Sequence, residues 1–207
     1  PTVTGQVFSS GVGITKCLEA VWPAWERAKK YSSQYNNALG KSIHKKGVGI
    51  ATCWYGCGNT SIANPSTIRI GIRQNGQIIL HQGATDIGQG SNTVITQIVA
   101  DAIQTDINSI ELIGPDTDLT PDAGKTSASR QTFISGEAAS LAGKALREKI
   151  LRHANVGENA RIKSGSTGLY IEDSKRSHQV DLCHLPLDEF GYVLSVQESY
   201  DPVTTPL

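Results

Sequence analysis

The segment TIRIGIRQNGQIILHQGATDIGQG, residues 67–90, determines the fold that we expect the rest of the chain to adopt. Isoleucines alternate with other residues over Thr67–Arg73, which is typical of a strand with one buried face. Asn75-Gly76 then supplies the positive φ of a tight hairpin turn, and Gln77–His81 returns as the second strand. The hairpin leads directly into the glycine-rich turn Gly83–Gly90.

A helix is predicted after this turn, over Ser91–Gln104, because apolar residues recur there at helical spacing. The first turn of a helix presents unpaired N–H groups and the positive pole of the dipole, and glycines let an anionic group approach the backbone. Gln89 adds an amide that both donates and accepts hydrogen bonds. Two interpretations stay open: a cradle for a phosphate or a polar heterocycle, or a turn that only joins a strand to a packed helix.

A second informative segment is TSASRQT, residues 126–132, which is predicted to open a long helix that runs to Ile150. Several residues of that helix are small, so another element can approach it closely. The serines either cap the helix or, together with Arg130 and the backbone N–H groups, bind phosphate. Two helix beginnings of this kind, each after a strand, can face one anionic cofactor from two sides.

The remaining periodicities predict an α+β fold, with mixed sheets and long amphipathic helices packed on them. An amphipathic helix is expected over Ile14–Lys30, where Pro23 implies a kink or a split, and an exposed connector follows to Lys46. We expect two parts, an N-terminal helix and connector over residues 1–46 and a cofactor-binding domain over residues 47–207. Further strands are predicted at Gly47–Trp54, Ile107–Ile113, Arg161–Lys163, Gly168–Ile171 and Gly191–Gln197.

The composition excludes several classes of function. The formal net charge of the 207 residues is zero, so nothing indicates a nucleic-acid partner, and no apolar run approaches the ~20 residues of a membrane span. Cys53 and Cys57 could share a metal, but no second pair at ligand spacing follows. We therefore expect no metal ligands in this chain, buried cysteines and a reducing, cytoplasmic compartment.

The chain is expected to be a piece of a longer protein. It begins at Pro1, contains no methionine, and ends at residues 201–207 in a polar, turn-forming stretch that follows a strand-like run. No nucleophile, base and orienting acid can be assembled into a triad, so no catalytic residue is assigned.

Several segments resemble, in order, the molybdenum hydroxylases, the family of xanthine dehydrogenase and aldehyde oxidoreductase. Gly83–Gly90 is similar to the family's second glycine–glutamine motif, and Ser127–Gln131 to its later Ser-Arg-Gln motif at the start of a long helix. Weaker likenesses are carried by Pro1–Gln6, His44–Ile50 and Tyr55–Gly58. The resemblance covers nearly all of the chain and fades between Asn155 and Asp188.

This resemblance implies a molybdopterin-binding subunit that carries molybdenum on molybdopterin cytosine dinucleotide. Such enzymes hydroxylate an aldehyde or an N-heterocycle with oxygen from water and pass electrons to iron–sulfur clusters and often a flavin, on other domains or subunits. The implied partners are the remainder of the molybdopterin subunit, those subunits, a small-molecule substrate and further copies in an oligomer. The cofactor-binding residues carried over are Ile87, Gly88, Gln89, Gly90, Ser127, Ala128, Ser129, Arg130 and Gln131.

The chain also departs from the family pattern. It lacks the earlier glycine–phenylalanine–glycine motifs, the arginine loop near the metal and the later Gly-Glu segment that holds the general base. The isolated piece is therefore expected to be inactive. Two alternatives stay open: a non-catalytic binding or assembly domain that keeps the fold without cofactor, and a nucleotide-binding protein that uses the glycine turn alone.

Overall fold

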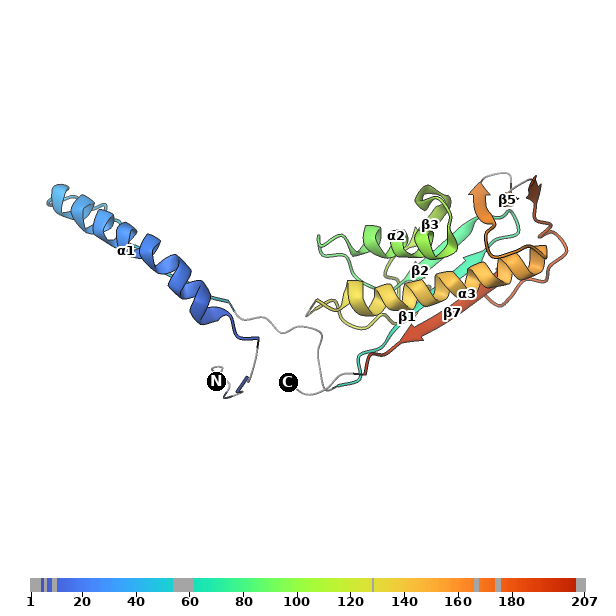
Figure 1. Ribbon diagram of the computed structural model, residues 1–207, viewed down its shortest axis with the longest axis horizontal. Coiled ribbons are helices and arrows are strands. Elements are labelled where there is room, and N and C mark those ends of the chain that lie inside the picture. The colour runs from blue at the N-terminus through green and yellow to red at the C-terminus, as the bar shows by residue number, and fades with distance from the viewer. Residues whose placement is uncertain are drawn as a thin grey trace. The chain divides into compact units, whose positions relative to one another are not determined.

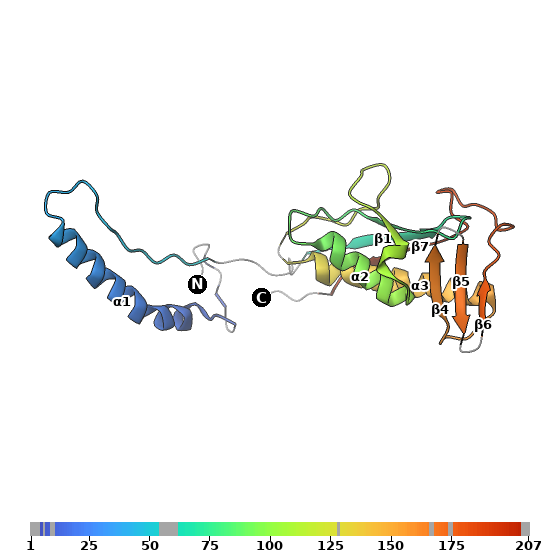
Figure 2. The ribbon, with the colours of Figure 1, turned by 90° about the horizontal axis from the view of Figure 1, so that it is seen from above.

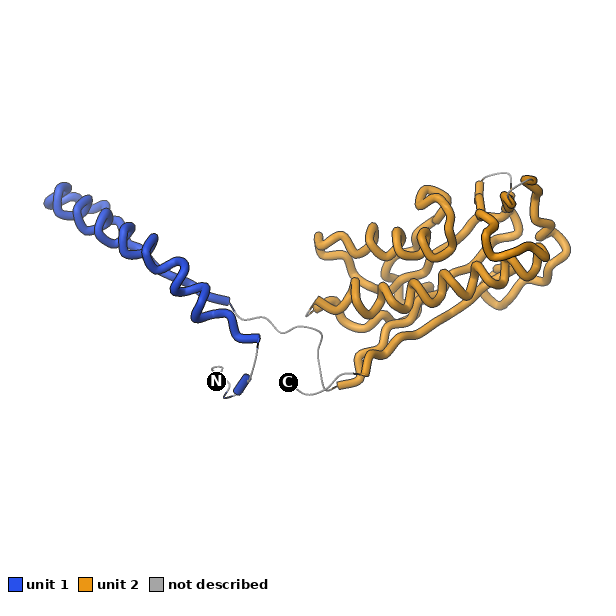
Figure 3. The backbone as a smooth tube through the Cα atoms, in the orientation of Figure 1, with its two compact units in different colours: residues 1–55, 207 blue, residues 56–206 orange. Residues whose placement is uncertain are grey.

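The computed structural model describes residues 5, 7–8, 11–53, 62–127, 129–165, 168–173 and 176–203 of the 207-residue chain. The chain divides into two compact units, residues 1–55 with residue 207, and residues 56–206 (Figure 3). The expected domains 1–46 and 47–207 place the boundary earlier, and that division stays a prediction.

The second unit is built on a four-stranded mixed sheet in the order β3-β2-β1-β7 (Figure 1). The hairpin of β1 (Ser66–Ile72) and β2 (Ile78–Gln82) lies at its centre, with Ile70 opposite Leu80. Strand β7 (Leu194–Tyr200) pairs antiparallel with β1, and β3 (Ile110–Ile113) pairs parallel with β2. The predicted α+β class with mixed sheets is confirmed.

Helices α2 (Ser91–Ile103) and α3 (Gly136–Ala154) lie side by side against this sheet (Figures 1 and 2). A β carbon on Gly143 of α3 would lie 2.6 Å from Cβ of Ala102 on α2, so only glycine permits this approach. The small residues of the second segment's helix thus admit another element, as predicted. The core between helices and sheet is apolar and fully buried, and includes Ile68, Ile70, Ile72, Leu80, Ile95, Val99, Ile103, Ala138, Ala142, Leu146 and Ile150.

A three-stranded antiparallel sheet, β4-β5-β6, completes the second unit. It consists of β4 (Arg161–Gly165), β5 (Gly168–Asp173) and β6 (Arg176–Gln179), the last of which the sequence did not predict. Ile162 and Ile171 carry its buried face. In Figure 1 this sheet lies at one end of the unit, and the N-terminal ends of α2 and α3 lie together at the other.

The first unit contains α1 (Ile14–Ala38), which continues through Pro23 and is longer than predicted. Ser32 is its one buried residue. The following segment folds back on the helix: the Asn36 amide donates to the Lys46 carbonyl at 2.8 Å and accepts from the Lys46 N–H at 2.8 Å. The predicted connector therefore consists of the last part of α1 and of an irregular segment that lies along this helix.

One expectation about local structure is wrong, and the structure adds detail to two others. Residues 47–53 form no strand and are exposed, since no partner strand covers their apolar side chains; Trp54 lies outside the described residues. The hairpin loop has three residues, because Arg73 accepts from the Gly76 N–H and donates to the Gln77 carbonyl, and Gly76 alone has a positive φ, 87°. The second segment also begins its helix later, as a π-helix (Gln131–Ser135) that leads into α3.

Candidate functional site

The glycine turn is closed by its own aspartate. The Asp86 carboxylate accepts from the backbone N–H groups of Gly88 at 2.9 Å, Gly90 at 3.2 Å and Asn92 at 3.1 Å. These bonds, led by that of Asn92, hold the pKa of Asp86 below its usual 3.8. The expectation that this helix beginning offers unpaired N–H groups to a phosphate is thus wrong for these three groups, because Asp86 already supplies the anion.

Gln89 folds back over the same turn. Its amide oxygen accepts from the Ile87 N–H at 2.6 Å, and its amide nitrogen donates to the Thr85 carbonyl and the Ser91 hydroxyl, each at 3.1 Å. Ile87, Gly88 and Gln89 are exposed, and nothing lies within 4 Å of a β carbon built on Gly88 or Gly90. The turn therefore presents an open, polar outer surface even though its inner hydrogen bonds are satisfied.

The second segment is buried where the first is exposed. Arg130 is 1% exposed, and its guanidinium donates to Asn64 Oδ1 at 2.7 Å and to the main-chain oxygens of Asn64, Pro65, Ala123 and Lys125. Five bonds use all five N–H donors of an arginine. In this arrangement the side chain ties the entry of β1 to the loop that precedes the π-helix, and it has no donor left for a phosphate.

Gln131 continues this buried network. Its amide nitrogen donates to the Lys125 carbonyl at 3.1 Å and to the Thr126 hydroxyl at 3.2 Å, and its amide oxygen accepts from Ser135. Ser135 in turn shares a 2.7 Å hydrogen bond with Ser66 on β1. The expected serine caps are absent from the described residues at this helix start, since no side chain caps the π-helix or α3.

The two segments lie against each other. The Thr126 hydroxyl donates to the Thr85 carbonyl at 2.9 Å, and that carbonyl is the oxygen to which Gln89 also donates. A β carbon on Gly83 would lie 2.4 Å from the Pro121 carbonyl, which shows how closely the loop before the second segment passes the start of the turn. Ser127 is half-buried and Ser129 is exposed with φ of 55°, whereas Ala128 lies outside the described residues.

Sequence reasoning missed two residues of this region, Asp86 and Thr126. Asp86 carried a signal, because an aspartate two residues before a glycine favours a local turn in which its carboxylate accepts from the backbone. The role of Thr126 depends on a partner 41 residues away and carries no local signal.

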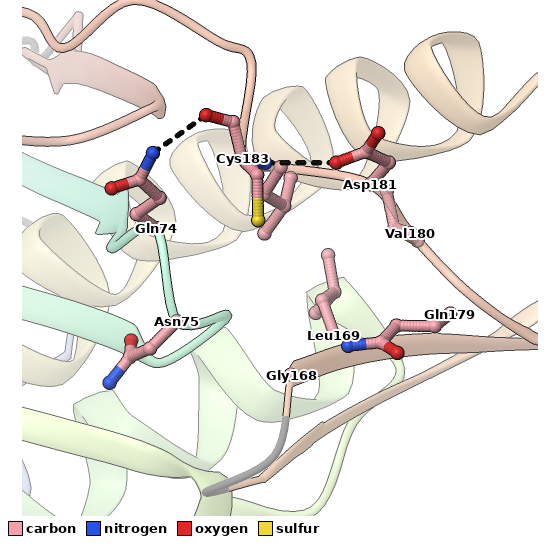
Figure 4. A pocket seen from close by; sticks show the side chains of 9 residues that line it. Gln74, Asn75, Gly168, Leu169, Gln179, Val180, Asp181 and Cys183 are labelled. Atoms are coloured by element: carbon pink, nitrogen blue, oxygen red, sulfur yellow. Dashed lines mark hydrogen bonds between the residues drawn. The ribbon is translucent and has the colours of Figure 1, made fainter.

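A hollow, shown in Figure 4, lies elsewhere in the second unit. It has a volume of about 400 Å³ and is lined by the hairpin loop, β5, β6 and residues 180–183. Gln74 donates to the Cys183 carbonyl at 2.8 Å, and the Cys183 N–H donates to Asp181 at 3.0 Å across its rim. None of the residues expected to bind cofactor lines it.

The prediction of buried cysteines is wrong for the three cysteines that the structure describes. Cys17, Cys53 and Cys183 are exposed free thiols, not buried apolar groups, and Cys57 lies outside the described residues. Within the described ranges, no group of three or more histidine, cysteine, aspartate or glutamate side chains is arranged to hold a metal ion. Nor does the described chain contain a helix long and apolar enough to cross a membrane.

Together, the mixed sheet, the paired helices and the two adjoining segments define an α+β domain in which two motifs far apart in the sequence lie against each other. Comparison with known proteins gives the family: residues 18–200 match the molybdopterin cofactor-binding domain, and the chain belongs to that family. The resemblance to the molybdenum hydroxylases is confirmed.

Relatives and solved structures agree with this assignment. The chain is 32% identical over 162 residues to the putative xanthine dehydrogenase molybdenum-binding subunit XdhA of Escherichia coli, which covers 75% of the chain and 20% of that subunit. The aldehyde oxidoreductase from Desulfovibrio gigas has the same fold, with a TM-score of 0.56 at 18% identity over 97% of the chain and 19% of that protein. The Cu,Mo-CO dehydrogenase has a TM-score of 0.52 at 18% sequence identity, and the match covers 94% of this chain and 27% of that protein. The chain thus spans about a fifth of the length of the relative XdhA.

The residues at the adjoining segments suit the pterin part of such a cofactor. A pterin is a flat heterocycle whose edge both donates and accepts hydrogen bonds, and the exposed surface here offers backbone, amide and hydroxyl groups with open space beside two glycines. A pyrophosphate is suited less well, because the Asp86 carboxylate already accepts from the turn's N–H groups.

Proposed function

We propose that this chain is the cofactor-holding piece of a molybdenum hydroxylase that carries molybdopterin cytosine dinucleotide. When bound, the cofactor supplies the redox chemistry that hydroxylates an aldehyde or N-heterocycle with oxygen from water. Electrons leave to iron–sulfur clusters, and often a flavin, on other domains or subunits of an oligomeric enzyme. No residue of this chain is given a catalytic role.

One observation carries the proposal. Thr126, next to the Ser127–Gln131 motif, donates to the carbonyl of Thr85 in the glycine turn, 41 residues away, and Gln89 of the same turn also donates to that carbonyl. The proximity supports a single binding surface that draws on both segments.

The proposed roles follow from exposure. The backbone of Ile87–Gly90 and the hydroxyls of Ser127 and Ser129 would contact the cofactor. Ala128, which lies outside the described residues, is proposed with them from the family resemblance alone. Gln89 would contact it by exchanging its internal hydrogen bonds for bonds to the pterin edge. Arg130 and Gln131, which are buried, would hold the loop that presents these groups.

A second candidate is a non-catalytic binding or assembly domain that keeps the fold without cofactor. The closed hydrogen bonding of the turn favours it, because Asp86 satisfies three N–H groups and Gln89 satisfies a fourth with no ligand involved.

The enzyme that contains this chain, isolated with its partners, separates the two candidates. Molybdenum and the cytidine nucleotide released by acid hydrolysis are measured per folded protein. Both should be present, and Gln89→Ala should lower both roughly three- to tenfold, the effect of one or two lost hydrogen bonds. Gln74→Ala is the matched control, since Gln74 is also exposed and also donates to a carbonyl, at the hairpin loop.

Absence of molybdenum and cytidine from the native enzyme would favour the non-catalytic domain. Equal cofactor content in the Gln89→Ala and Gln74→Ala enzymes would remove the glycine turn from the binding surface.

A further inference from the structure

Thr126 stands out because its hydroxyl is the only side-chain link that the described residues show between the glycine turn and the loop before the π-helix. The hydroxyl donates to the Thr85 carbonyl at 2.9 Å and accepts from the Gln131 amide at 3.2 Å. A hydroxyl has one proton and two lone pairs, so it can make both bonds at once.

The bonds from both segments converge on the Thr85 carbonyl. The Thr85 carbonyl, which has two lone pairs, also accepts from Gln89 at 3.1 Å. A chain of hydrogen bonds therefore links Gln89 to Gln131 through the Thr85 carbonyl and the Thr126 hydroxyl. Each of these four groups donates or accepts as its chemistry allows. Beyond Gln131 the chain of bonds continues through Ser135 to Ser66 on the central strand.

We infer that Thr126 is a positioning residue that sets the register of the glycine turn against the second cofactor motif. The inference deepens the proposed function and rests on it, because that proposal supplies the ligand of the two segments. The coupling between the segments concerns this chain's residues alone. Thr126 carries the position of the buried, rigid segment to the exposed turn, so that Gln89 and Ser127 present their polar groups in a fixed relation. It does not itself touch a reacting atom.

Among the described residues, no other side-chain hydrogen bond supplies this coupling. The Asp86 bonds lie within residues 86–92 and hold the shape of the turn, not its place on the second segment. The Arg130 bonds reach residues 64–65 and 123–125 but no residue of the turn. Gly83 allows the close approach at Pro121 without a side-chain bond.

The experiment compares Thr126→Val, which removes the hydroxyl and keeps the branched shape, with Thr126→Ser, which keeps the hydroxyl. Thr120→Val is the control, because the Thr120 hydroxyl is equally half-buried and also both donates and accepts, but with a single residue, Asp116, inside one loop. Backbone hydrogen exchange is measured first, in the full enzyme produced in a host that cannot synthesise molybdopterin.

Thr126→Val should speed amide exchange at residues 85–90 roughly three- to tenfold, whereas Thr126→Ser and Thr120→Val should leave it within twofold of the native rate. Exchange within α3 should be unchanged in all three, which separates positioning from a general loss of stability. In the cofactor-loaded enzyme, molybdenum per folded protein should fall with Thr126→Val and recover with Thr126→Ser.

Unchanged exchange at residues 85–90 in Thr126→Val overturns the inference, and so does a Thr126→Ser protein that behaves like Thr126→Val. A native enzyme without molybdenum overturns the proposed function, while the exchange comparison still decides the coupling. If Thr126→Val does not fold, native-like exchange in Thr126→Ser together with faster exchange in Thr126→Ala supports it, and equal exchange in those two overturns it.

Discussion

The glycine turn and the Ser-Arg-Gln segment lie side by side, but they are stabilised in opposite ways. The side-chain bonds of Asp86 and Gln89 join residues within 85–92, only the Thr126 hydroxyl reaches the turn from elsewhere among the described residues, and the tip is exposed, with Ile87 at 74%. The second segment is buried at Arg130 and Gln131, and its partners lie up to 66 residues away. The first is a local structure and the second a tertiary one.

This difference indicates which substitutions should affect ligand binding and which should affect folding. A local turn forms from its own residues, so a change in it affects the surface shown to a ligand more than the fold. A buried network unites the entry of β1, the preceding loop and the π-helix, so a change in it affects folding first. Three comparisons test this contrast.

The largest effect is expected for Arg130→Lys. An ammonium has three donors and no planar fork, so at least two of five buried acceptors lose their partner, and we expect unfolding to become easier by about 3 kcal/mol. The denaturant midpoint, followed by circular dichroism, measures this. Arg147→Lys is the control, since Arg147 is also buried and donates to the carbonyls of Ile103, Glu158 and Ala160.

Both arginine variants should lose stability, but hydrogen exchange at residues 123–126 should quicken only in Arg130→Lys. An Arg130→Lys protein of native stability that has lost its cofactor would mean that the guanidinium binds phosphate directly. If the role is packing alone, stability falls while cofactor per folded protein stays constant.

A smaller and more discriminating effect is expected when the same change is made in both motifs. Gln131→Glu replaces a buried donor by an acceptor that faces the Lys125 carbonyl, and should cost about 2–3 kcal/mol. Gln89→Glu loses the exposed bond to the Thr85 carbonyl, but its carboxylate can still accept from the Ser91 hydroxyl, so the change should cost under about 1 kcal/mol. Thermal unfolding of the two variants checks the order, and equal losses would erase the distinction between local and tertiary motifs.

The sequence predicted best what depends on neighbours in the chain. Alternating isoleucines predicted the hairpin, and helical spacing predicted α2 to within one residue of its end at Ile103. The family resemblance located both motifs. The predicted strand at residues 47–53 failed because an apolar run forms a strand only where another strand pairs with it, and none does so in the described chain.

What the sequence could not predict depends on distant partners. An arginine after serines at a helix start suits a phosphate, and only the tertiary structure shows that residues 64–65 and 123–125 take all its donors. Likewise Thr126 reads as one more polar residue until Thr85 is found beside it. The role of Asp86 could be predicted from the neighbouring sequence. Its carboxylate, however, accepts from the same N–H groups that the glycine turn was expected to offer to an anionic ligand.

The smallest effect, and the one most dependent on pH, is expected for Asp86→Asn. Because the N–H groups of Asn92, Gly88 and Gly90 lower the pKa of Asp86 below 3.8 in the folded state, the unfolded chain takes up a proton more readily than the folded one. The carboxylate therefore stabilises the fold fully above pH 3.8, and this contribution disappears as the pH falls through the lower folded pKa. The gap in melting temperature between native and Asp86→Asn proteins should be constant from pH 7 to about 5 and should close below 3.8.

Asp101→Asn, on the exposed side of α2, controls for the loss of one charge. A native–Asp86→Asn gap that persists unchanged well below pH 3.8, or that is absent at neutral pH, would mean that the turn does not depend on its own anion. The N–H groups of Gly88, Gly90 and Asn92 would then be available to a phosphate after all, and the first motif would resemble the anion cradle that its glycines suggested. If the gap closes as expected, the turn is complete without a ligand, and its affinity for cofactor must come from the outer surface that Gln89 and its neighbours present.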